Sequence, residues 1–212
     1  MSIMNFSEEN GTNYSLTCVN NSSADWVFYI YQKMPNQPKE VFSLAWFASP
    51  YKISSGDQIT FHWSINYSFV WGDTGTLKPG ITYNASGKKS CSPDGNNQTT
   101  FSMNDNTPQL SIPIPGGQAG SLTIHEDGNI PNNKFSTGIG MSGQGTFVQQ
   151  GLQNIDQVYT PEPVYYIAAA QSIQMGCVLA QSISKSQQVV FDANIYSLTA
   201  TLGSDQLWTI SN

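Results

Sequence analysis

The sequence contains no arginine, and charged residues of all kinds make up only 10% of its 212 positions. An average soluble domain has about 25% charged residues, so the polar surface of this protein must be built from other side chains. All eight basic residues are lysines, and the formal net charge is -6. Without arginine or a basic stripe, the chain lacks the groups that clamp phosphates and read base edges, which argues against nucleic acid as a partner.

Two further absences concern membranes and export. The sequence has no run of about 18 apolar residues, so we expect no membrane-spanning helix. Its first ten residues, MSIMNFSEEN, include neither a basic region nor an apolar core and therefore do not resemble a secretory signal peptide. We expect a cytoplasmic protein, or one that is exported without a conventional signal peptide.

Cysteine is scarce and widely spaced, at Cys18, Cys91 and Cys177 only. No Cys-x-x-Cys or Cys/His spacing indicates structural zinc. Any pairing within the chain leaves one thiol over. Free buried thiols in a reducing compartment are therefore the first interpretation, and one disulfide with one free thiol is the alternative.

Uncharged polar residues are abundant, since 26 Ser, 16 Thr, 18 Asn and 17 Gln make up 77 of the 212 positions. Residues 59–71, ITFHWSINYSFVW, place an apolar or aromatic side chain at every odd position. A period of two is typical of a strand with one buried face. At about 3.3 Å per residue such a strand is roughly 40 Å long, which predicts a long two-sheet sandwich.

Shorter strand patterns recur along the chain between turn signals rich in Gly, Pro and Asn. In residues 189–202 the apolar parity changes, which predicts a strand with a bulge near Ala193 and Asn194. Residues 165–175 hold enough alanine for a helix as a minority alternative. The sequence therefore predicts an all-β fold, an antiparallel β-sandwich with long loops, of which a jelly-roll is one form. The other expected strands are 14–19, 26–31, 41–47, 81–85, 98–103, 109–113, 121–125, 146–150, 164–170, 176–183 and 207–210.

We expect a flexible N-terminal segment over residues 1–13 and a single β-sandwich domain over residues 14–212. Residues 84–158 hold 11 of the 18 glycines but only three of the 25 aromatic residues. So few large side chains do not supply a core of their own. We interpret this stretch as a glycine-rich elaboration of loops and short strands.

No motif in the sequence carries recognisable chemistry. Residues 138–143, GIGMSG, match GxGxxG, but the preceding strand and following helix of a dinucleotide site are not indicated, so we predict a loop or hairpin. His62 and His125 show no metal-binding spacing, and there is no GxSxG elbow. We assign no catalytic residue and expect a non-enzymatic protein without a cofactor.

Turns that combine acids and amides are the best candidate binding sites. Oxygen-rich loops of this kind suit Ca²⁺ or a glycan, although the EF-hand pattern is absent. Ordinary hairpin turns are the alternative interpretation of the same residues. The candidate residues are Asp73, Asp94, Asn96, Asp127 and Asn129.

Three blocks of sequence resemble a known family. They are LAWF at residues 44–47, WSINYSFVW at residues 63–71 and YSLTATL at residues 196–202. In these blocks the chain resembles the RhiA family of rhizobial rhizosphere-expressed proteins. The resemblance implies a small, abundant bacterial protein connected with host or community interaction, and it implies no catalytic motif.

Our leading hypothesis is a non-enzymatic β-sandwich that binds a ligand or assembles with itself. Few surface charges mean little repulsion between copies, and long strands offer edges to neighbours. One alternative is a lectin-like module that binds carbohydrate or calcium. A second is a polysaccharide hydrolase, which needs only a pair of carboxylates. The expected partner is a second copy of the chain or a glycan.

Overall fold

The computed structural model describes residues 12–212, which form seventeen strands joined by turns and loops, without a helix. The all-β prediction is confirmed, and the helix considered for residues 165–175 is wrong because residues 164–170 form a strand. Of the predicted flexible segment, residues 1–11 lie outside the described range, and Asn13 already begins β1 (Asn13–Asn20). Within residues 12–212 no helix is long and apolar enough to cross a membrane.

The strands form four sheets, and most neighbouring strands run antiparallel. Two pairs are parallel, β1 with β16 and β8 with β10. In the first sheet the order is β17 (Trp208–Ser211), β16 (Ser197–Leu202), β1 and β5 (Gln58–Ser64). The second is β15 (Gln187–Val189), β14 (Val164–Ala170), β2 (Val27–Lys33) and β4 (Phe47–Ala48). The third is β3 (Phe42–Ser43), β12 (Gln144–Gln150), β11 (Phe135–Met141), β6 (Tyr67–Asp73) and β7 (Gly87–Cys91). The fourth is β13 (Ile155–Tyr159), β10 (Leu122–Glu126), β8 (Gln98–Asn104) and β9 (Thr107–Leu110).

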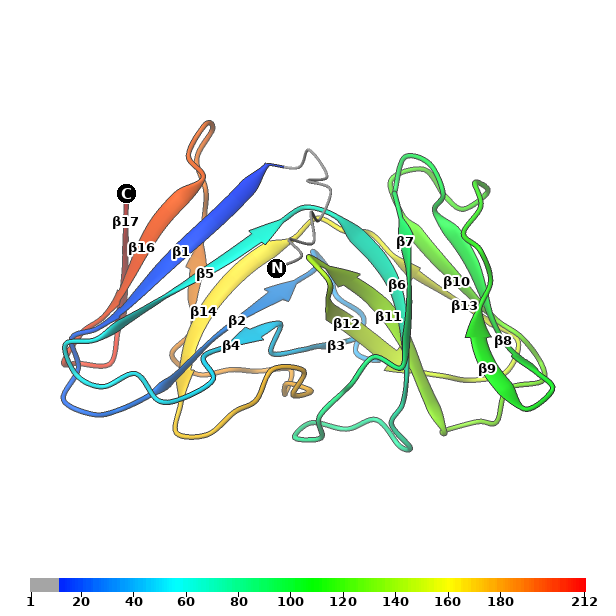
Figure 1. Cartoon of the computed structure of the whole chain (residues 1–212), viewed down its shortest axis with the longest axis horizontal. Helices are drawn as coiled ribbons and strands as arrows, with labels where there is room; N and C mark the ends of the chain where they lie inside the picture. Colours follow the sequence, from blue (N-terminus) through cyan, green and yellow to red (C-terminus); the bar gives the residue numbers. More distant parts are fainter. Residues whose placement is uncertain (1–11) are drawn as a thin grey trace, which may run out of the picture.

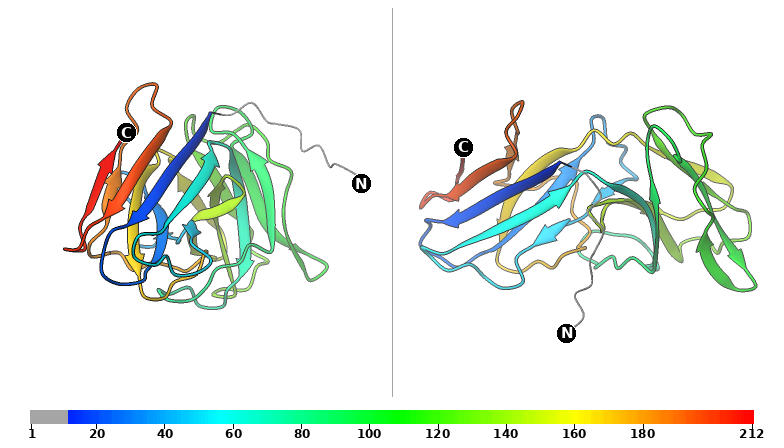
Figure 2. Two further views of the ribbon diagram at one scale, coloured as in Figure 1. Left: turned by 60° about the vertical axis from the view of Figure 1, so that its left-hand side comes forward. Right: turned by 45° about the horizontal axis from the view of Figure 1, so that its top comes forward.

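These sheets pack in two sandwiches that lie at opposite ends of the long axis (Figures 1 and 2). The first and second sheets enclose one apolar core, which includes Phe28, Trp46 and Trp63. The third and fourth sheets enclose another, which includes Phe101 and Phe135. We call these units the first and the second sandwich.

The predicted long strand at residues 59–71 is divided between the two sandwiches. β5 ends at Ser64 and β6 begins at Tyr67, so Ile65 and Asn66 form the link from the first sheet to the third. The Asn66 Oδ1 atom accepts a hydrogen bond of 2.9 Å from the backbone N–H of Ser142. Asparagine favours turns because its side chain can bond to backbone groups in this way. The alternation predicts the buried face of β5 correctly. In β6 both faces are buried, since Ser68 and Val70 are 8% and 2% exposed, and the predicted continuity across Asn66 is wrong.

Residues 84–158 supply seven strands, from β7 to β13, and so contribute most of the second sandwich. The predicted hairpin at the GIGMSG motif is confirmed, since Ser142 and Gly143 connect β11 to β12 with φ angles of 52° and 77°. Two central residues with positive φ are typical of the tightest hairpin turns. A Cβ atom on Gly138 would collide with the carbonyl of Phe147, so this glycine permits the close approach of β11 and β12.

Other expected strands are shorter, interrupted or absent in the structure. Residues 81–85 and 176–183 form only isolated bridges, so the strands predicted there are wrong. Residues 41–47 contain only β3 and the start of β4, which belong to different sheets. The predicted bulged strand over residues 189–202 is wrong. A turn separates β15 from β16, in which the N–H of Ile195 donates to the carbonyl of Asp192 at 3.0 Å and Asn194 has a φ of 65°.

One long connection, residues 171–186, covers the outer face of the second sheet. Leu179 from this connection packs with Tyr29 and Tyr31 of β2 and with Ala168 of β14. Side chains alternate along a strand, so Tyr29, Tyr31 and Lys33 share this outer face while Phe28 and Ile30 point into the first core. This arrangement creates the cleft described next.

Candidate functional site

The turn residues that the sequence favoured for binding do not converge on one site. Asp73 lies exposed at the end of β6, and Asp94 and Asn96 lie exposed in the loop between β7 and β8. Asp127 and Asn129 follow β10. Because β8 and β10 are parallel, residues before β8 and residues after β10 lie at opposite ends of the fourth sheet. In residues 12–212 no group of three or more His, Cys, Asp or Glu side chains is placed to hold a metal ion.

Asn129 has a structural role in its loop. Its Oδ1 atom accepts from the backbone N–H of Met103, and its Nδ2 donates to the Met103 carbonyl, both at 2.9 Å. The side-chain amide thus pairs with β8 as a neighbouring strand would. Asp127 accepts a 2.7 Å bond from the N–H of Gly128. Both side chains are engaged in structural hydrogen bonds. The segment is not the hairpin turn of the alternative interpretation, because β10 and β11 belong to different sheets.

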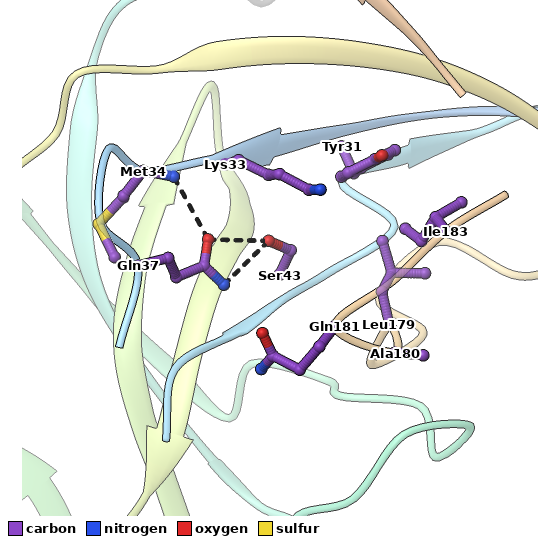
Figure 3. A pocket seen from close by; sticks show the side chains of 9 residues that line it. All are labelled: Tyr31, Lys33, Met34, Gln37, Ser43, Leu179, Ala180, Gln181 and Ile183. Carbon is purple, nitrogen blue, oxygen red and sulfur yellow. Dashed lines mark hydrogen bonds between the residues drawn. The ribbon is translucent and has the colours of Figure 1, made fainter. Parts of the chain in front are cut away.

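The cleft with the most varied chemistry lies between the end of β2 and the connection that covers the second sheet. It has a volume of about 260 Å³. Its polar groups come from Lys33, Gln37, Ser43 and Gln181, and Tyr31 forms part of its floor. Figure 3 shows the Gln37 amide and the Ser43 hydroxyl together on one side, and the aliphatic side chains of Leu179 and Ile183 on the other. We call it the Lys33 cleft.

Local hydrogen bonds explain how the polar side of the Lys33 cleft is held. The Gln37 Nε2 donates to the carbonyl of Val41 at 2.9 Å, which closes the proline-containing loop after β2. The Ser43 hydroxyl donates to the carbonyl of Gln32 at 2.6 Å and thereby ties β3 to β2. From the opposite wall, Gln181 Nε2 donates to the carbonyl of Lys39 at 3.2 Å. The amide oxygen of Gln181 makes no hydrogen bond within the described part of the chain.

The electrostatic character of the cleft is set by one cation without a counter-ion. The Lys33 ammonium lies 6.0 Å from the centroid of the Tyr31 ring and 5.2 Å from that of Tyr166. Across residues 12–212 no carboxylate lies within 4.0 Å of it. Burial raises the pKa of Tyr31, so its hydroxyl stays neutral and donates to Ser186 at 2.9 Å. The cleft therefore presents one positive charge, two amides and a hydroxyl beside an aliphatic wall.

Sequence reasoning missed this cleft. One sequence signal for this cleft is the alternation that places Tyr29, Tyr31 and Lys33 on the same face of a strand. On that face a lysine follows two aromatic residues. No local pattern connects that stripe to Gln181, which lies almost 150 positions later in the chain. The segment Met34–Lys39 was interpreted only as a proline-rich loop.

Outside the Lys33 cleft, the titratable groups of residues 12–212 include no nucleophile that is prepared for catalysis. All three cysteines are free thiols, of which Cys18 is buried as predicted while Cys91 and Cys177 are only half-buried, and burial raises the pKa of each one. A thiol with a raised pKa stays protonated and is a weak nucleophile. His125 Nδ1 lies 2.7 Å from Asp156 Oδ1 on the exposed face of the fourth sheet, and His62 lies exposed on β5.

A carboxyl group is buried inside the second sandwich. Glu126 is fully buried, and its Oε1 accepts from the Thr137 hydroxyl at 2.5 Å and from Gln157 Nε2 at 3.1 Å. Its Oε2 accepts from the N–H of Leu152 at 2.6 Å. Burial raises the pKa of Glu126 to about 7, although the bonds from Thr137 and Leu152 and the charge of His125 lower it in part. Glu126 joins β10 to β11 and β13, and its contacts are structural.

Comparison with known proteins places the chain in a family. The profile of the RhiA family matches residues 11–212. "Protein RhiA" from Rhizobium leguminosarum bv. viciae is 49% identical to the chain over 202 residues, which cover 95% of this chain and 87% of that protein. No solved structure matches the chain. The resemblance in the three sequence blocks is thus confirmed over almost the whole chain, which belongs to the RhiA family.

Proposed function

We propose that the protein is a non-enzymatic binding protein that holds a small organic anion with an apolar body in the Lys33 cleft. The observation that carries this proposal is the Lys33 ammonium, which lies over two tyrosine rings and has no carboxylate partner in residues 12–212.

The chemistry of the Lys33 cleft favours a carboxylate over a cation or a purely apolar ligand. An ammonium without a carboxylate partner is stabilised by an anion. The amide hydrogens of Gln37 and Gln181 already donate within the protein, so Lys33 supplies the main contact to the carboxylate. Leu179 and Ile183 offer an aliphatic surface for the rest of the ligand. The volume of about 260 Å³ equals that of about nine liquid waters, which suits a short-chain carboxylate.

The absence of acids from the cavities supports binding over hydrolysis. Glycoside hydrolysis uses two carboxylates that flank the scissile bond. In the described range, the Lys33 cleft and four further cavities are lined by no Asp or Glu side chain. The buried Glu126 reaches none of these cavities.

The proposal is tested by titrating hexanoate, and hexanol as its uncharged counterpart, into the labelled protein while following backbone amide signals by NMR. We expect hexanoate to shift signals of residues 31–43 and 179–183, and hexanol to bind at least tenfold more weakly. Replacing Lys33→Met removes a charged hydrogen bond worth about 1.5–3 kcal/mol, which is about tenfold or more in affinity. Lys39→Met, on the neighbouring loop, is the matched control and should bind like wild type. Equal affinities for the wild type and Lys33→Met contradict the proposal.

A second candidate function, self-association, is favoured by one apolar patch on the first sandwich. Ile65, Val190 and Tyr196 are 41%, 59% and 44% exposed. Ile65 and Val190 line a groove of about 300 Å³ with Tyr14 and Phe191, and the ring of Tyr196 packs 5.6 Å from that of Tyr14. Exposed apolar patches of this kind mark interaction sites on soluble proteins.

Light scattering after size exclusion tests this second function. If copies associate through the patch, the wild-type mass rises with concentration and Val190→Lys reduces it to that of the monomer. Leu207→Lys, at another exposed apolar position, leaves the association intact. A wild type that remains monomeric at every concentration removes the second candidate.

A further inference from the structure

The first sheet ends in β5, whose outer edge pairs with no other strand of residues 12–212 (Figure 1). With seven residues, β5 is the longest of the strands that form the edges of the four sheets. Proteins protect such edges with lysine or proline, because an open edge pairs with strands of other chains. The edge strand β7 carries Lys88 and Lys89, and β9 carries Pro108, but β5 contains no lysine, acid or proline. The longest edge is thus the one without this protection.

The direction of each backbone group in β5 follows from its neighbour β1. The N–H of Ser15 donates to the carbonyl of Tyr196, just before β16, at 2.8 Å. The N–H of Asn20 donates to the carbonyl of Asp57, just before β5, at 2.9 Å. Backbone groups alternate along a strand, so the odd residues of β1 bond towards β16 and the even residues towards β5. The even residues of β1 lie opposite three residues of β5, which are Ile59, Phe61 and Trp63.

The other residues of β5 direct their backbone groups away from β1. We call Gln58, Thr60 and His62 the β5 edge. Their N–H and C=O groups have no hydrogen-bond partner in the described part of the chain. Their side chains are exposed on the outer face of the sheet, whereas Phe61 and Trp63 are buried in the first core. The β5 edge therefore presents three free donors and three free acceptors to a strand that approaches it.

The β5 edge is closed at both ends. Before it, the N–H of Gly56 donates to the carbonyl of Asn20 at 2.7 Å. After it, the N–H of Ser64 donates to the Ser142 hydroxyl at 3.3 Å. Both of these donors are occupied, so an added strand finds free donors only on the β5 edge itself.

We propose that the β5 edge pairs with the β5 edge of a second copy in an antiparallel dimer whose two-fold axis passes beside Thr60. The edge is symmetric about Thr60, so Thr60 lies opposite Thr60 and Gln58 lies opposite His62. Each of these three pairs exchanges two backbone hydrogen bonds, which satisfies every free donor and acceptor of both edges. A register shifted by two residues in either direction would need the N–H of Gly56 or of Ser64, which already has a partner.

The side chains of β5 are compatible with this pairing. On the inner face, Ile59 of one copy lies opposite Phe61 of the other, so the apolar row of the core continues across the interface. On the outer face, the two Thr60 side chains meet at the axis, and threonine pairs of this kind are favourable. The β5 edge includes no residue of the Lys33 cleft or of the apolar patch. The proposal therefore does not rest on either function proposed above.

Hydrogen exchange of backbone amides, followed by NMR in the Val190→Lys variant, tests the pairing without a contribution from the apolar patch. We expect the amides of Gln58, Thr60 and His62 to exchange at least tenfold more slowly at high than at low protein concentration, because they are bonded only in the dimer. The amide of Phe61, which faces β1, should exchange slowly at both concentrations. Exchange that does not depend on concentration overturns the proposal. Fast exchange then means an open edge, and slow exchange means an occupant from the same chain.

Charge at the axis provides a second test. Thr60→Lys places two positive charges directly opposite each other, so it should abolish the concentration-dependent slow exchange. Ser197→Lys, which is also exposed but lies two strands away on β16, is the matched control and should leave the slow exchange unchanged. Both variants should keep the thermal midpoint of the parent protein, which shows that they fold. Equal exchange in the two variants overturns the proposal.

A cross-link tests the register. The Cα atoms of a hydrogen-bonded antiparallel pair lie about 5.5 Å apart, within the range that a disulfide spans. Thr60→Cys should therefore form a covalent dimer on oxidation, whereas Ser197→Cys and the wild type should remain largely monomeric on a non-reducing gel. The proposal is also overturned if Thr60→Cys and Ser197→Cys cross-link equally.

Discussion

Replacing Glu126→Gln should make the stability of the protein less sensitive to pH. Glu126 is fully buried, and no lysine or arginine lies within salt-bridge distance of it in the described range. The Thr137 hydroxyl carries one hydrogen but lies 2.5 Å from Glu126 Oε1 and 2.8 Å from Gln157 Oε1. A protonated Glu126 resolves this conflict, because the acid donates to Thr137 and Thr137 donates to Gln157.

The magnitude follows from the pKa of Glu126, which burial raises from 4.5 to about 7. A raised carboxyl pKa means that the folded state keeps a proton that the unfolded state releases between pH 4.5 and 7. Folding stability is therefore fully present below pH 4.5 and falls as pH rises through about 7. A difference of about 2.5 pKa units corresponds to about 3 kcal/mol, of which about 2.5 kcal/mol is lost between pH 5 and pH 8.5.

Glutamine is the appropriate replacement because it reproduces the neutral acid. Its Nε2 can donate to the Thr137 hydroxyl in place of the acid proton, and its Oε1 can accept from the N–H of Leu152. The side-chain amide of this variant does not titrate, but its Nε2 takes the place of the oxygen that accepts from Gln157 Nε2 in the wild type. Because one hydrogen bond is lost, we expect the variant to be less stable than the wild type by about 1 kcal/mol near pH 5. Near pH 8.5 the variant should be more stable by about 1.5 kcal/mol.

Urea unfolding followed by tryptophan fluorescence at pH values from 5 to 8.5 measures this difference. Glu162→Gln is the matched control, because this exposed acid has no buried partner to lose. Its stability should follow that of the wild type at every pH. Parallel pH profiles for Glu126→Gln and the wild type, within about 0.5 kcal/mol, would refute the reasoning.

Three further predictions concern packing, buried polar groups and thiols. In urea titrations, Gly138→Ala should lower the free energy of unfolding by about 1–3 kcal/mol, because the new Cβ collides with the backbone of β12. The control is Gly95→Ala, whose Cβ would meet no atom closer than 3.8 Å and which should change this free energy by less than about 0.5 kcal/mol. Asn20→Ala should lower it by about 2–4 kcal/mol in the same assay. The fully buried Asn20 amide donates to the carbonyls of Ala24 and Ile53 and accepts from the backbone N–H of Ser22, which loses its partner in the variant. An effect below about 1 kcal/mol contradicts this. In a thiol-labelling assay at pH 8, Cys177 should react in the folded protein, whereas the fully buried Cys18 should react only after the protein unfolds. Equal labelling rates for the two thiols would contradict the burial of Cys18.

The strands that could be predicted from the sequence are those with one solvent-exposed face and one buried face. β1 and β16 alternate almost perfectly, so the period of two was visible in both of these distant segments. β11 was missed because all seven of its residues are buried and four of them are serine, threonine or glycine, which leaves no alternation. β7 was missed for the opposite reason, since it is an edge strand with two lysines and little apolar character.

The site was less predictable than the fold, for two physical reasons. The Lys33 cleft depends on two segments that meet only when the second sheet is covered by residues 171–186, and neither segment is unusual alone. Glu126 belongs to the sequence His-Glu-Asp-Gly, which indicates a solvated turn. Glu126 is buried because β10 packs against β11, and no local sequence pattern predicts this contact.

The parallel pairing of β1 with β16 has a consequence for the order in which the chain folds during its synthesis. These strands are aligned from Ser15 with Ser197 to Asn20 with Leu202, so β1 must await a partner made about 180 residues later. Apart from β3, the second sandwich is built from residues 67–159 and can assemble earlier during synthesis. The first sandwich is complete only when residues 197–211 have left the ribosome, and until then the backbone edge of β1 that pairs with β16 stays open. Removal of residues 197–212 would therefore delete β16 and β17 together and leave β1 as an open edge.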